Sequence, residues 1–569
     1  MTQDRRLRVL GLVVILMFGA AWARAAEMTT LQRDSLQGKL QEGRQPQAVA
    51  APRGTITDRK GLVLAISEAA ADISASPLAI KDPAGVAEQM APILGLDEAK
   101  LRGKLTGAAG FVWVARLVPE AQVKKLRALA LPGVTISPTT RRSYPQETVA
   151  SQLIGFSGID GKGLAGIELS LEKTLRGTDG KRLLVWGRGG KDARVVYVKD
   201  EQPTQPGQNV KLTIDARIQA RAEQDLAQYG GMFGAASGTA IVMQPTTGNV
   251  LAMASWPKVD ANDPASAPAE ARQVTATGFS YEPGSTFKPF TVAGGLETRA
   301  ISPSTSFTVP YSIQVADQQI KDAETHGTEI MTPGDILAKS SNVGTIQIAR
   351  DKLGITRFDQ WIRKFGFGQP TGVEVPGEER GRLLKTDDYS GSSIGNLPIG
   401  QGELVTPMQL ATAYSTIAND GVREQPTLID EVGGKRPAKA EGKRIVSAST
   451  ATEIRQMLKR VTESGGTGAQ LTIPGYEVAG KTGTAQHVDP TTGEYSHKLY
   501  TASFVGMAPA DRPRAVVAVI IDKPTRGAYY GAEVAGPAFK DLMRWTLNYL
   551  AVPTDKAAGS TSGATGSGN

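Results

Sequence analysis

Ser285 and Lys288 lie three positions apart in the stretch YEPGSTFKPF, directly after a Pro-Gly turn. On the first turn of a helix, residues at i and i+3 are neighbours, so the lysine ammonium can reach the serine hydroxyl. A lysine that has lost its proton could take one from the serine there and create a nucleophile. The same pattern also fits an N-capping serine followed by a solvated lysine.

This serine–lysine spacing is not specific by itself, because the chain contains it three times. Ser170 and Lys173 lie in a charged amphipathic helix pattern, and Ser255 and Lys258 lie at a strand end that a proline interrupts. Only the pair that begins at Ser285 follows a turn and opens an apolar run. The rest of the chain must decide among the three.

The stretch AKSSNVGTIQIA, residues 338–349, places hydroxyl and amide side chains at the head of a helical pattern. Ser340 could relay a proton in a cleft, and Asn342, two residues on, could orient a substrate amide. The segment also fits an ordinary helix N-cap with polar neighbours.

The stretch AGKTGTAQ, residues 479–486, contains Lys481, Thr482, Gly483 and Thr484 inside an apparent strand. Glycine in a strand often marks the close approach of another backbone or of a ligand. A lysine and hydroxyls beside it would suit a substrate carboxylate. An edge strand without a ligand is the alternative interpretation.

Lys288 is the available base for a serine nucleophile. The three histidines are scattered and no GxSxG turn occurs, so a Ser-His-Asp triad is hard to assemble. The lysine must be neutral when it acts, and burial together with a nearby second cation would have to lower its pKa.

The composition indicates a globular protein without metal or thiol chemistry. Hydrophobic residues make up 40% of the 569 residues and charged residues 21%, and this length predicts two or three domains. The net charge is +8, but basic residues are scattered among nearly as many acids, which disfavours nucleic-acid binding. The chain has no cysteine and its three histidines lack zinc-site spacing, so we expect no metal and no cofactor.

The N-terminal residues predict export or membrane anchoring. Residues 1–8 carry three arginines, and residues 9–23 are uninterrupted apolar sequence. That run fits the apolar region of a signal peptide, and Ala23–Ala25 resembles a cleavage site. The twenty residues Leu7–Ala26 are also enough to cross a bilayer core of about 30 Å. Either way, residues 1–8 stay inside and the rest acts outside the cytoplasmic membrane.

The first half of the chain predicts a small mixed domain after a connector. Residues 27–50 are polar and indicate a helical stalk or linker. From 51 to 206, short strand patterns alternate with helical ones, such as 86–104 and 119–130. The Pro- and Gln-rich stretch 202–209 reads as a domain boundary.

The second half has the alternating content of an α+β or α/β domain. It begins as a strand that becomes an amphipathic helix, and residues 238–255 predict a β-hairpin. Near the end, YEVAGKTGTAQ, YTASFVGMAPA and RAVVAVIIDKP read as three consecutive strands. The segment 555–569 is rich in Gly, Ser and Thr and predicts a disordered tail.

Together the three stretches form S-x-x-K, S-x-N and K-T-G, in that order. Their first residues are separated by 55 positions (285 to 340) and 141 positions (340 to 481). These are the three motifs of penicillin-binding proteins and serine β-lactamases. Together with IGQGELVTPMQLATAYSTIANDG and PRGTITDRKGLVLA, they make the chain similar to a class B penicillin-binding protein from about residue 50 to 548.

The resemblance implies roles for the first two motifs. Ser285 would attack the penultimate D-alanine carbonyl of a peptidoglycan stem peptide and release the terminal D-alanine. Lys288 would take the serine proton, and Ser340 would help to deliver it to the leaving amine. Asn342 would hold the donor peptide. β-Lactams would be trapped by the same serine, because their strained amide mimics D-Ala-D-Ala.

The resemblance also assigns the third motif. Lys481, Thr482 and Thr484 would engage the terminal carboxylate, with Gly483 between them in the substrate-binding strand. Lys481 would also help to depress the pKa of Lys288. The backbone N–H groups of Ser285 and Thr484 would form the oxyanion hole.

For the fold, the resemblance implies a multidomain α+β protein. It would comprise a cytoplasmic tail at 1–8, a membrane signal-anchor at 9–26, a mixed α/β pedestal resembling the dimerisation module at 27–206, a transpeptidase domain at 207–550 and a disordered tail at 551–569. In the transpeptidase domain we expect an antiparallel sheet flanked by helices, with the serine at a helix N-terminus beside the KTG strand.

The implied partners are peptidoglycan stem peptides, a polytopic membrane glycan polymerase contacted through residues 9–60, and other division proteins. No nucleic acid is implied. The sequence is most like the septal, cell-division member of the class. An elongation-type transpeptidase, a carboxypeptidase or β-lactamase that deacylates with water, and a catalytically silent scaffold remain as alternatives.

Overall fold

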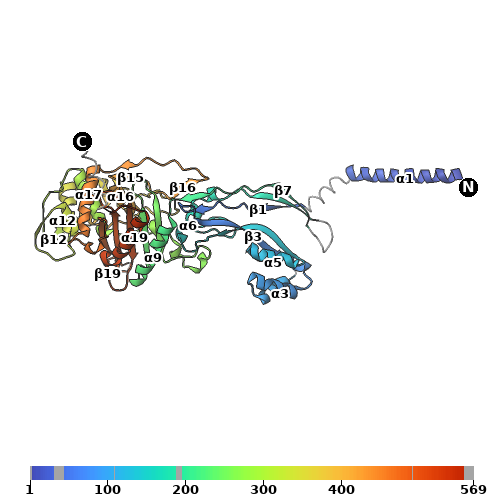
Figure 1. Cartoon of the computed structure of the whole chain (residues 1–569), viewed down its shortest axis with the longest axis horizontal. Coiled ribbons are helices and arrows are strands. Elements are labelled where there is room, and N and C mark those ends of the chain that lie inside the picture. The colour runs from blue at the N-terminus through green and yellow to red at the C-terminus, as the bar shows by residue number, and fades with distance from the viewer. Residues whose placement is uncertain (1–2, 31–43, 108, 187–194, 490, 556–569) are drawn as a thin grey trace, which may run out of the picture. The chain divides into compact units, whose positions relative to one another are not determined.

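The computed structural model describes residues 3–30, 44–107, 109–186, 195–489 and 491–555 (Figure 1). The chain divides into two compact units. The first comprises Met1–Arg53, Ser67–Arg141 and Arg176–Gly207, and the second comprises Gly54–Ile66, Arg142–Leu175 and Gln208–Asn569. The predicted tail at 551–569 lies outside the described residues from 556 onward.

The first unit contains a long apolar helix and a three-stranded sheet. Helix α1 (Gln3–Thr30) includes Val9–Met28, a segment long and apolar enough to cross a membrane, by its length and composition. The antiparallel sheet has the order β1-β6-β7, with β1 (Arg44–Val49), β6 (Gly180–Trp186) and β7 (Val195–Gln202). The prediction of a stalk or linker at 27–50 is therefore wrong at its C-terminal end, where β1 pairs with β6. Residues 31–43 lie outside the described residues.

A second group of elements in the first unit surrounds its own apolar core. The group comprises the later part of β3 (Val63–Ala75), β4 (Val112–Pro119), β5 (Val134–Ser143), the 3₁₀ turn η1 (Pro77–Ala79), α3 (Pro83–Leu94), α4 (Glu98–Leu105) and α5 (Glu120–Leu129). The helix predicted at 86–104 is two helices. Gly95 ends α3 with a φ of 67°, and the Asp97 side chain caps α4 by accepting from Lys100 N.

The second unit begins with a small sheet and short helices. Within this unit the strand order is β16-β8-β2-β3, in which β2 (Ile56–Thr57) runs parallel to β8 (Val210–Leu212) and β16 (Ile429–Val432) runs antiparallel to it. The short helices are α6 (Ser151–Ile154), α7 (Gly166–Ser170) and α8 (Glu172–Leu175).

A five-stranded antiparallel sheet forms the centre of the second unit, in the order β10-β9-β20-β19-β18. Its strands are β9 (Ser237–Met243), β10 (Val250–Trp256), β18 (Ala479–Val488), β19 (Tyr495–Ala508) and β20 (Ala515–Asp522). The predicted hairpin at 238–255 and the three predicted C-terminal strands are confirmed.

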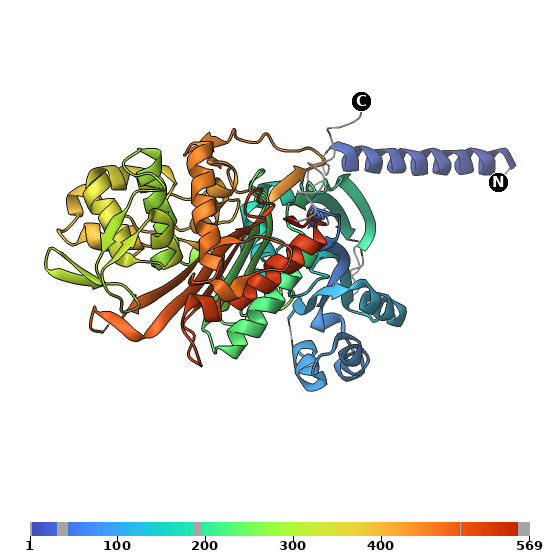
Figure 2. The same cartoon turned by 60° about the vertical axis from the view of Figure 1, so that its left-hand side comes forward.

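Both faces of this sheet are buried, because the side chains of each strand alternate between two cores. In β20, Val517, Val519 and Ile521 face one core, and Val516 and Ile520 face the other. Helices α9 (Ala216–Met232) and α19 (Gly536–Tyr549) lie side by side over the first face (Figure 2). Helix α16 (Pro407–Ala418) packs on the other face.

The other α-helices and strands of the second unit, together with η5 and η6, complete its fold. They are α10 (Thr275–Gly278), η5 (Gly284–Phe287), α11 (Lys288–Glu297), β11 (Phe307–Val309), β12 (Ser312–Val315), β13 (Gln318–Lys321), β14 (Glu329–Met331), α12 (Pro333–Ala338), α13 (Asn342–Gln347), the π-helical η6 (Ile348–Leu353), α14 (Ile355–Lys364), α15 (Ser393–Asn396), β15 (Val422–Arg423), β17 (Lys443–Arg444), α17 (Ala448–Thr462) and α18 (Gly531–Val534). The predicted fold class, an antiparallel sheet flanked by helices, is confirmed.

Candidate active site

The Pro-Gly turn places Ser285 at the start of a helix, as the sequence predicts. Gly284 has a φ of 54°, a left-handed conformation that glycine adopts without strain, and it opens the 3₁₀ turn η5. Side chains at i and i+3 eclipse in a 3₁₀ turn, so Ser285 and Lys288 project from the same side. Pro289 is the second residue of α11, where its missing N–H costs little.

Lys288 is fully buried and joins the first motif to the second. Its Nζ donates to the Ser340 carbonyl oxygen at 2.5 Å, to Ser340 Oγ at 3.2 Å and to Asn342 Oδ1 at 2.7 Å. The carbonyl of Ser340 is available because this residue has a φ of 57° and precedes helix α13. Among the described residues, these three bonds replace the expected direct bond between Lys288 and Ser285.

Asp322, a residue that the sequence analysis missed, holds the second motif. Its Oδ2 accepts from Ser341 Oγ at 2.7 Å, and its Oδ1 accepts from Val343 N at 2.9 Å. Ser341 itself caps α13 by accepting from Gly344 N at 2.9 Å. The carboxylate therefore fixes the loop that presents Ser340 and Asn342. A lone aspartate after a short strand carries no signal that could have found it.

The third motif lies on β18, the edge strand of the central sheet. Lys481 is fully buried, and its Nζ donates to the carbonyl oxygen and the hydroxyl of Thr482, both at 3.3 Å. The Thr482 hydroxyl also lies 3.0 Å from that of Thr467, which the sequence analysis did not single out. The amine of Lys481 and the hydroxyl of Thr482 thus cluster on β18, and Thr467 adds a hydroxyl from a neighbouring segment.

Glycines allow β18 to approach the nucleophile turn closely. A Cβ on Gly483 would lie 2.8 Å from Thr286 Cγ2 and 3.1 Å from the Pro283 carbonyl oxygen. A Cβ on Gly284 would lie 3.3 Å from the Thr484 carbonyl oxygen. The strand and the turn are therefore in close backbone contact.

The pKa values of the two buried lysines are strongly lowered. Burial lowers the pKa of Lys288 to about 7, against the opposing charge of Asp322. Burial, and then the charge of Lys288, lowers the pKa of Lys481 well below its ordinary value. Two cations this close in a low-dielectric interior cannot both keep their protons. At neutral pH Lys288 can act as a base.

Within the described residues, no group of three or more His, Cys, Asp or Glu side chains gathers as a metal site. Two of the three histidines are held by carboxylates: His326 Nε2 lies 3.0 Å from Asp322 Oδ2, and His487 Nε2 lies 2.8 Å from Asp522 Oδ1. The side chains that the three motifs bring together are a serine, two lysines and several hydroxyls. Such a set can transfer an acyl group through a serine ester.

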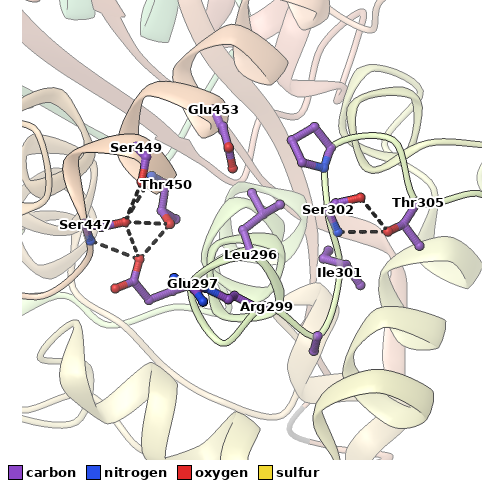
Figure 3. A pocket seen from close by; sticks show the side chains of 12 residues that line it. Leu296, Glu297, Arg299, Ile301, Ser302, Thr305, Ser447, Ser449, Thr450 and Glu453 are labelled. Carbon is purple, nitrogen blue, oxygen red and sulfur yellow. Dashed lines mark hydrogen bonds between the residues drawn. The ribbon is translucent and has the colours of Figure 1, made fainter.

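A separate cavity of about 590 Å³ lies at the other end of α11 (Figure 3). Glu297, the last residue of that helix, lines it together with the N-terminus of α17. Glu297 Oε2 accepts from Ser447 N, Ser447 Oγ and Thr450 Oγ1 at 2.6–3.0 Å. None of the three motifs reaches this cavity.

Two family models match the chain. Residues 238–544 match the penicillin-binding protein transpeptidase domain, and residues 48–212 match the penicillin-binding protein dimerisation domain.

Curated relatives are similar over most of their length. The chain is 33% identical over 562 residues to the probable peptidoglycan D,D-transpeptidase PenA of Neisseria gonorrhoeae, covering 98% of this chain and 94% of that protein. It is 33% identical over 517 residues to the peptidoglycan D,D-transpeptidase FtsI of Escherichia coli, covering 90% and 85%. It is 36% identical over 473 residues to the penicillin-binding protein PbpB of Mycobacterium tuberculosis, covering 80% and 69%.

Solved structures share the fold. A peptidoglycan synthetase from Bifidobacterium adolescentis is 28% identical with a TM-score of 0.72, covering 90% of this chain and 98% of that chain. Penicillin-binding protein 3 from Mycobacterium tuberculosis, complexed with aztreonam, is 31% identical with a TM-score of 0.70, covering 89% and 98%.

Proposed function

Because the chain belongs to the family of penicillin-binding protein transpeptidases, we propose that it is a peptidoglycan D,D-transpeptidase whose acyl-enzyme forms on Ser285. The observation that carries the proposal is the buried Lys288. Its amine contacts both polar residues of the second motif, and its pKa of about 7 suits a base at neutral pH.

Acylation begins when Ser285 Oγ attacks the carbonyl carbon of the penultimate D-alanine. The hydroxyl proton passes to the neutral Lys288 amine as the carbon–oxygen bond forms. The carbon–nitrogen bond to the terminal D-alanine then breaks, and the leaving amine receives the proton from Lys288 through Ser340, whose hydroxyl lies 3.2 Å from Nζ. An amine of a neighbouring stem peptide attacks the ester next, which makes the cross-link and frees the serine.

The donor peptide is held by the second and third motifs. Asn342 binds its backbone amide, and the cluster on β18, which comprises Lys481, Thr482 and Thr484 around Gly483, engages the terminal carboxylate. The N–H groups of Ser285 and Thr484 stabilise the oxyanion, which is supported by the contact between Gly284 and the Thr484 backbone. Oxyanion donors of this kind often contribute about 100- to 1000-fold in rate.

The proposed setting is the outer side of the bacterial cytoplasmic membrane, with α1 as a single-pass anchor. Residues 1–8 then form a cytoplasmic tail, residues 9–26 the span, residues 27–206 the pedestal and residues 207–550 the transpeptidase domain, followed by the tail. Peptidoglycan is the substrate and β-lactams are inhibitors. A polytopic glycan polymerase and division proteins are the proposed partners. The similarity to FtsI supports a septal role over an elongation role.

Cross-linking of synthetic stem peptides tests this function. The full chain in detergent is incubated with a donor that ends in D-Ala-D-Ala and an acceptor that carries a free side-chain amine, and the products are resolved by mass spectrometry. We expect the cross-linked dimer and free D-alanine, and neither with Ser285→Ala. Hydrolysed donor without dimer would indicate a carboxypeptidase. No turnover by the folded wild-type chain would indicate a scaffold.

A further inference from the structure

A glutamate three residues before the nucleophile binds two other segments of the site. Glu282 Oε1 accepts from Gly402 N at 3.0 Å and from the Tyr495 hydroxyl at 3.1 Å. Tyr495 is the first residue of β19, the partner strand of the KTG strand β18. One carboxylate oxygen therefore connects the nucleophile turn with a neighbouring loop and with the KTG hairpin.

The loop that contains Gly402 is paired with the nucleophile turn along its length. Tyr281 and Val405 exchange backbone hydrogen bonds of 3.0 and 2.9 Å, and Gly284 N donates to the Gly400 carbonyl oxygen at 2.9 Å. A Cβ on Gly400 would lie 2.1 Å from the Gly284 carbonyl oxygen. The bond from Gly402 to Glu282 lies between these two ends, so a shift of the loop would move the turn that carries the nucleophile.

A second glutamate lies next to this junction without a partner. Glu403 has an exposed fraction of 0%, and neither of its oxygens accepts a hydrogen bond from another described residue. Glu282 Oε2 is also buried and without a partner among the described residues. Burial, and then the charge of Glu282, raises the pKa of Glu403 well above its ordinary value. Two buried carboxyls whose charges repel share one proton more readily than they hold two charges.

Glu282 is the ionised carboxyl of the two, because its surroundings favour the carboxylate form. Burial raises the pKa of Glu282, and its hydrogen bonds from Gly402 and Tyr495 and the nearby charge of Arg382 offset part of that rise. No hydrogen bond from another described residue stabilises the ionised form of Glu403.

We propose that Glu282 is a positioning residue for the attack by Ser285, and that Glu403 beside it stays protonated. Ionised Glu282 holds the turn, the loop and the KTG hairpin in register, so that the serine faces the base and the oxyanion donors together. The neutral acid of Glu403 adds no second charge to this buried region. This inference rests on the proposed role of Ser285.

The test compares the acylation kinetics of Glu282 variants, with a fluorescent penicillin and the full chain in detergent. Glu282→Ala should lower the acylation rate constant at saturating penicillin by about 100-fold, because small displacements of a reacting group cost this much. The half-saturating concentration should change little. Glu282→Gln, whose amide oxygen can accept the same two bonds, should recover most of the loss.

Glu297→Ala is the matched control at the opposite end of the same helix. It also removes a carboxylate that accepts several hydrogen bonds, yet its acylation rate should stay within about twofold of the wild type, since distant sites act independently. If Glu282→Ala does not fold, Tyr495→Phe removes one hydroxyl and should still slow acylation by about tenfold. Wild-type rates in both variants, or an equal loss in Glu297→Ala, would overturn the positioning role.

The proton on Glu403 has its own spectroscopic signature. The infrared spectrum of the wild type at neutral pH should contain the carbonyl stretch of a protonated carboxylic acid that is missing from Glu403→Gln. Identical spectra in this region would show that Glu403 is ionised and would overturn this part of the inference. A wild-type chain that is not acylated on Ser285 would instead contradict the proposed function itself.

Discussion

The two ends of helix α11 carry ionisable side chains whose pKa values are shifted in different ways. At the N-terminal end, Lys288 is fully buried and its pKa falls to about 7. At the C-terminal end, burial disfavours the ionised form of Glu297, but hydrogen bonds from Thr450 and Ser447 outweigh this effect and lower its pKa (Figure 3). The N-terminal end thus holds a reactive amine whose charged form is destabilised. The C-terminal end holds a carboxylate whose charged form is stabilised by hydrogen bonds.

This difference separates catalysis from stability along one helix. A desolvated cation without a carboxylate partner costs folding free energy, and it is retained where a neutral amine is needed. A carboxylate that accepts three hydrogen bonds stabilises the junction of two helices instead. Variants at the N-terminal end should therefore slow acylation without loss of stability, whereas variants at the C-terminal end should lose stability with little effect on acylation.

The largest effect is expected for Lys288→Met, which replaces the amine with an apolar group of similar length. Loss of the base should lower the acylation rate constant by about 100- to 10,000-fold. The midpoint of thermal unfolding should stay equal or rise, because a buried cation has been removed. A Lys288→Met variant that unfolds at a lower temperature but is still acylated would contradict the proposed difference between the two ends.

Gly483→Ala should have the next largest effect. Its Cβ would lie 2.4 Å from Ser503 Oγ and 2.8 Å from Thr286 Cγ2, which would push β18 away from the nucleophile turn. We expect acylation to slow by about 100-fold. Gly231→Ala in α9 is the control, because its Cβ would meet nothing within 4 Å. Equal rates for the two variants would show that the close approach is not needed.

The pH dependence of acylation should follow Lys288. The amine must be neutral to accept a proton, so the rate constant should fall as the pH drops through about 7. Below that value it should fall by about tenfold per pH unit. Acylation rates of the wild type, measured from about pH 5 to pH 9, check this. A fall in the acylation rate constant that is centred near the ordinary pKa of lysine would contradict the perturbed pKa.

The smallest effect on acylation is expected for Glu297→Ala, which should instead lose about 1–3 kcal/mol of stability. Because the folded pKa of Glu297 is lowered, its contribution is present above about pH 4.3 and is lost as the pH falls through the folded pKa. Thermal unfolding of wild type and variant at two pH values measures this. A midpoint difference that grows as the medium becomes more acidic would contradict it.

The sequence predicts the central sheet well, because its strands are short apolar runs with clear turns between them. The segment at 515–521 is continuously apolar, as expected for a strand buried on both faces. The serine–lysine turn could also be placed, since Gly284 and Pro289 mark the start of a helix. The helix predicted at 86–104 failed because Gly95 and Asp97 end one helix and begin another.

The supporting residues of the site could not be predicted, because they come from distant segments without a motif of their own. Asp322 reaches the second motif from a short loop, and the charge of Glu282 acts on Glu403 although 121 positions separate them (282 to 403). A single carboxylate has no local signature of burial. The hydrogen bonds from the Lys288 amine to Ser340 and Asn342 depend on the left-handed backbone of Ser340. A serine at this position gives no sign of that conformation.

The most direct test of the account is the mass of the covalent adduct with benzylpenicillin, mapped to a peptide in the wild type and in Ser285→Ala. The account predicts one penicilloyl group per chain on the peptide that contains Ser285, stable over the assay and missing from the alanine variant. An adduct on another residue, or equal labelling of both proteins, would contradict the assignment of the nucleophile. Rapid loss of the adduct would point to a hydrolase with the same serine.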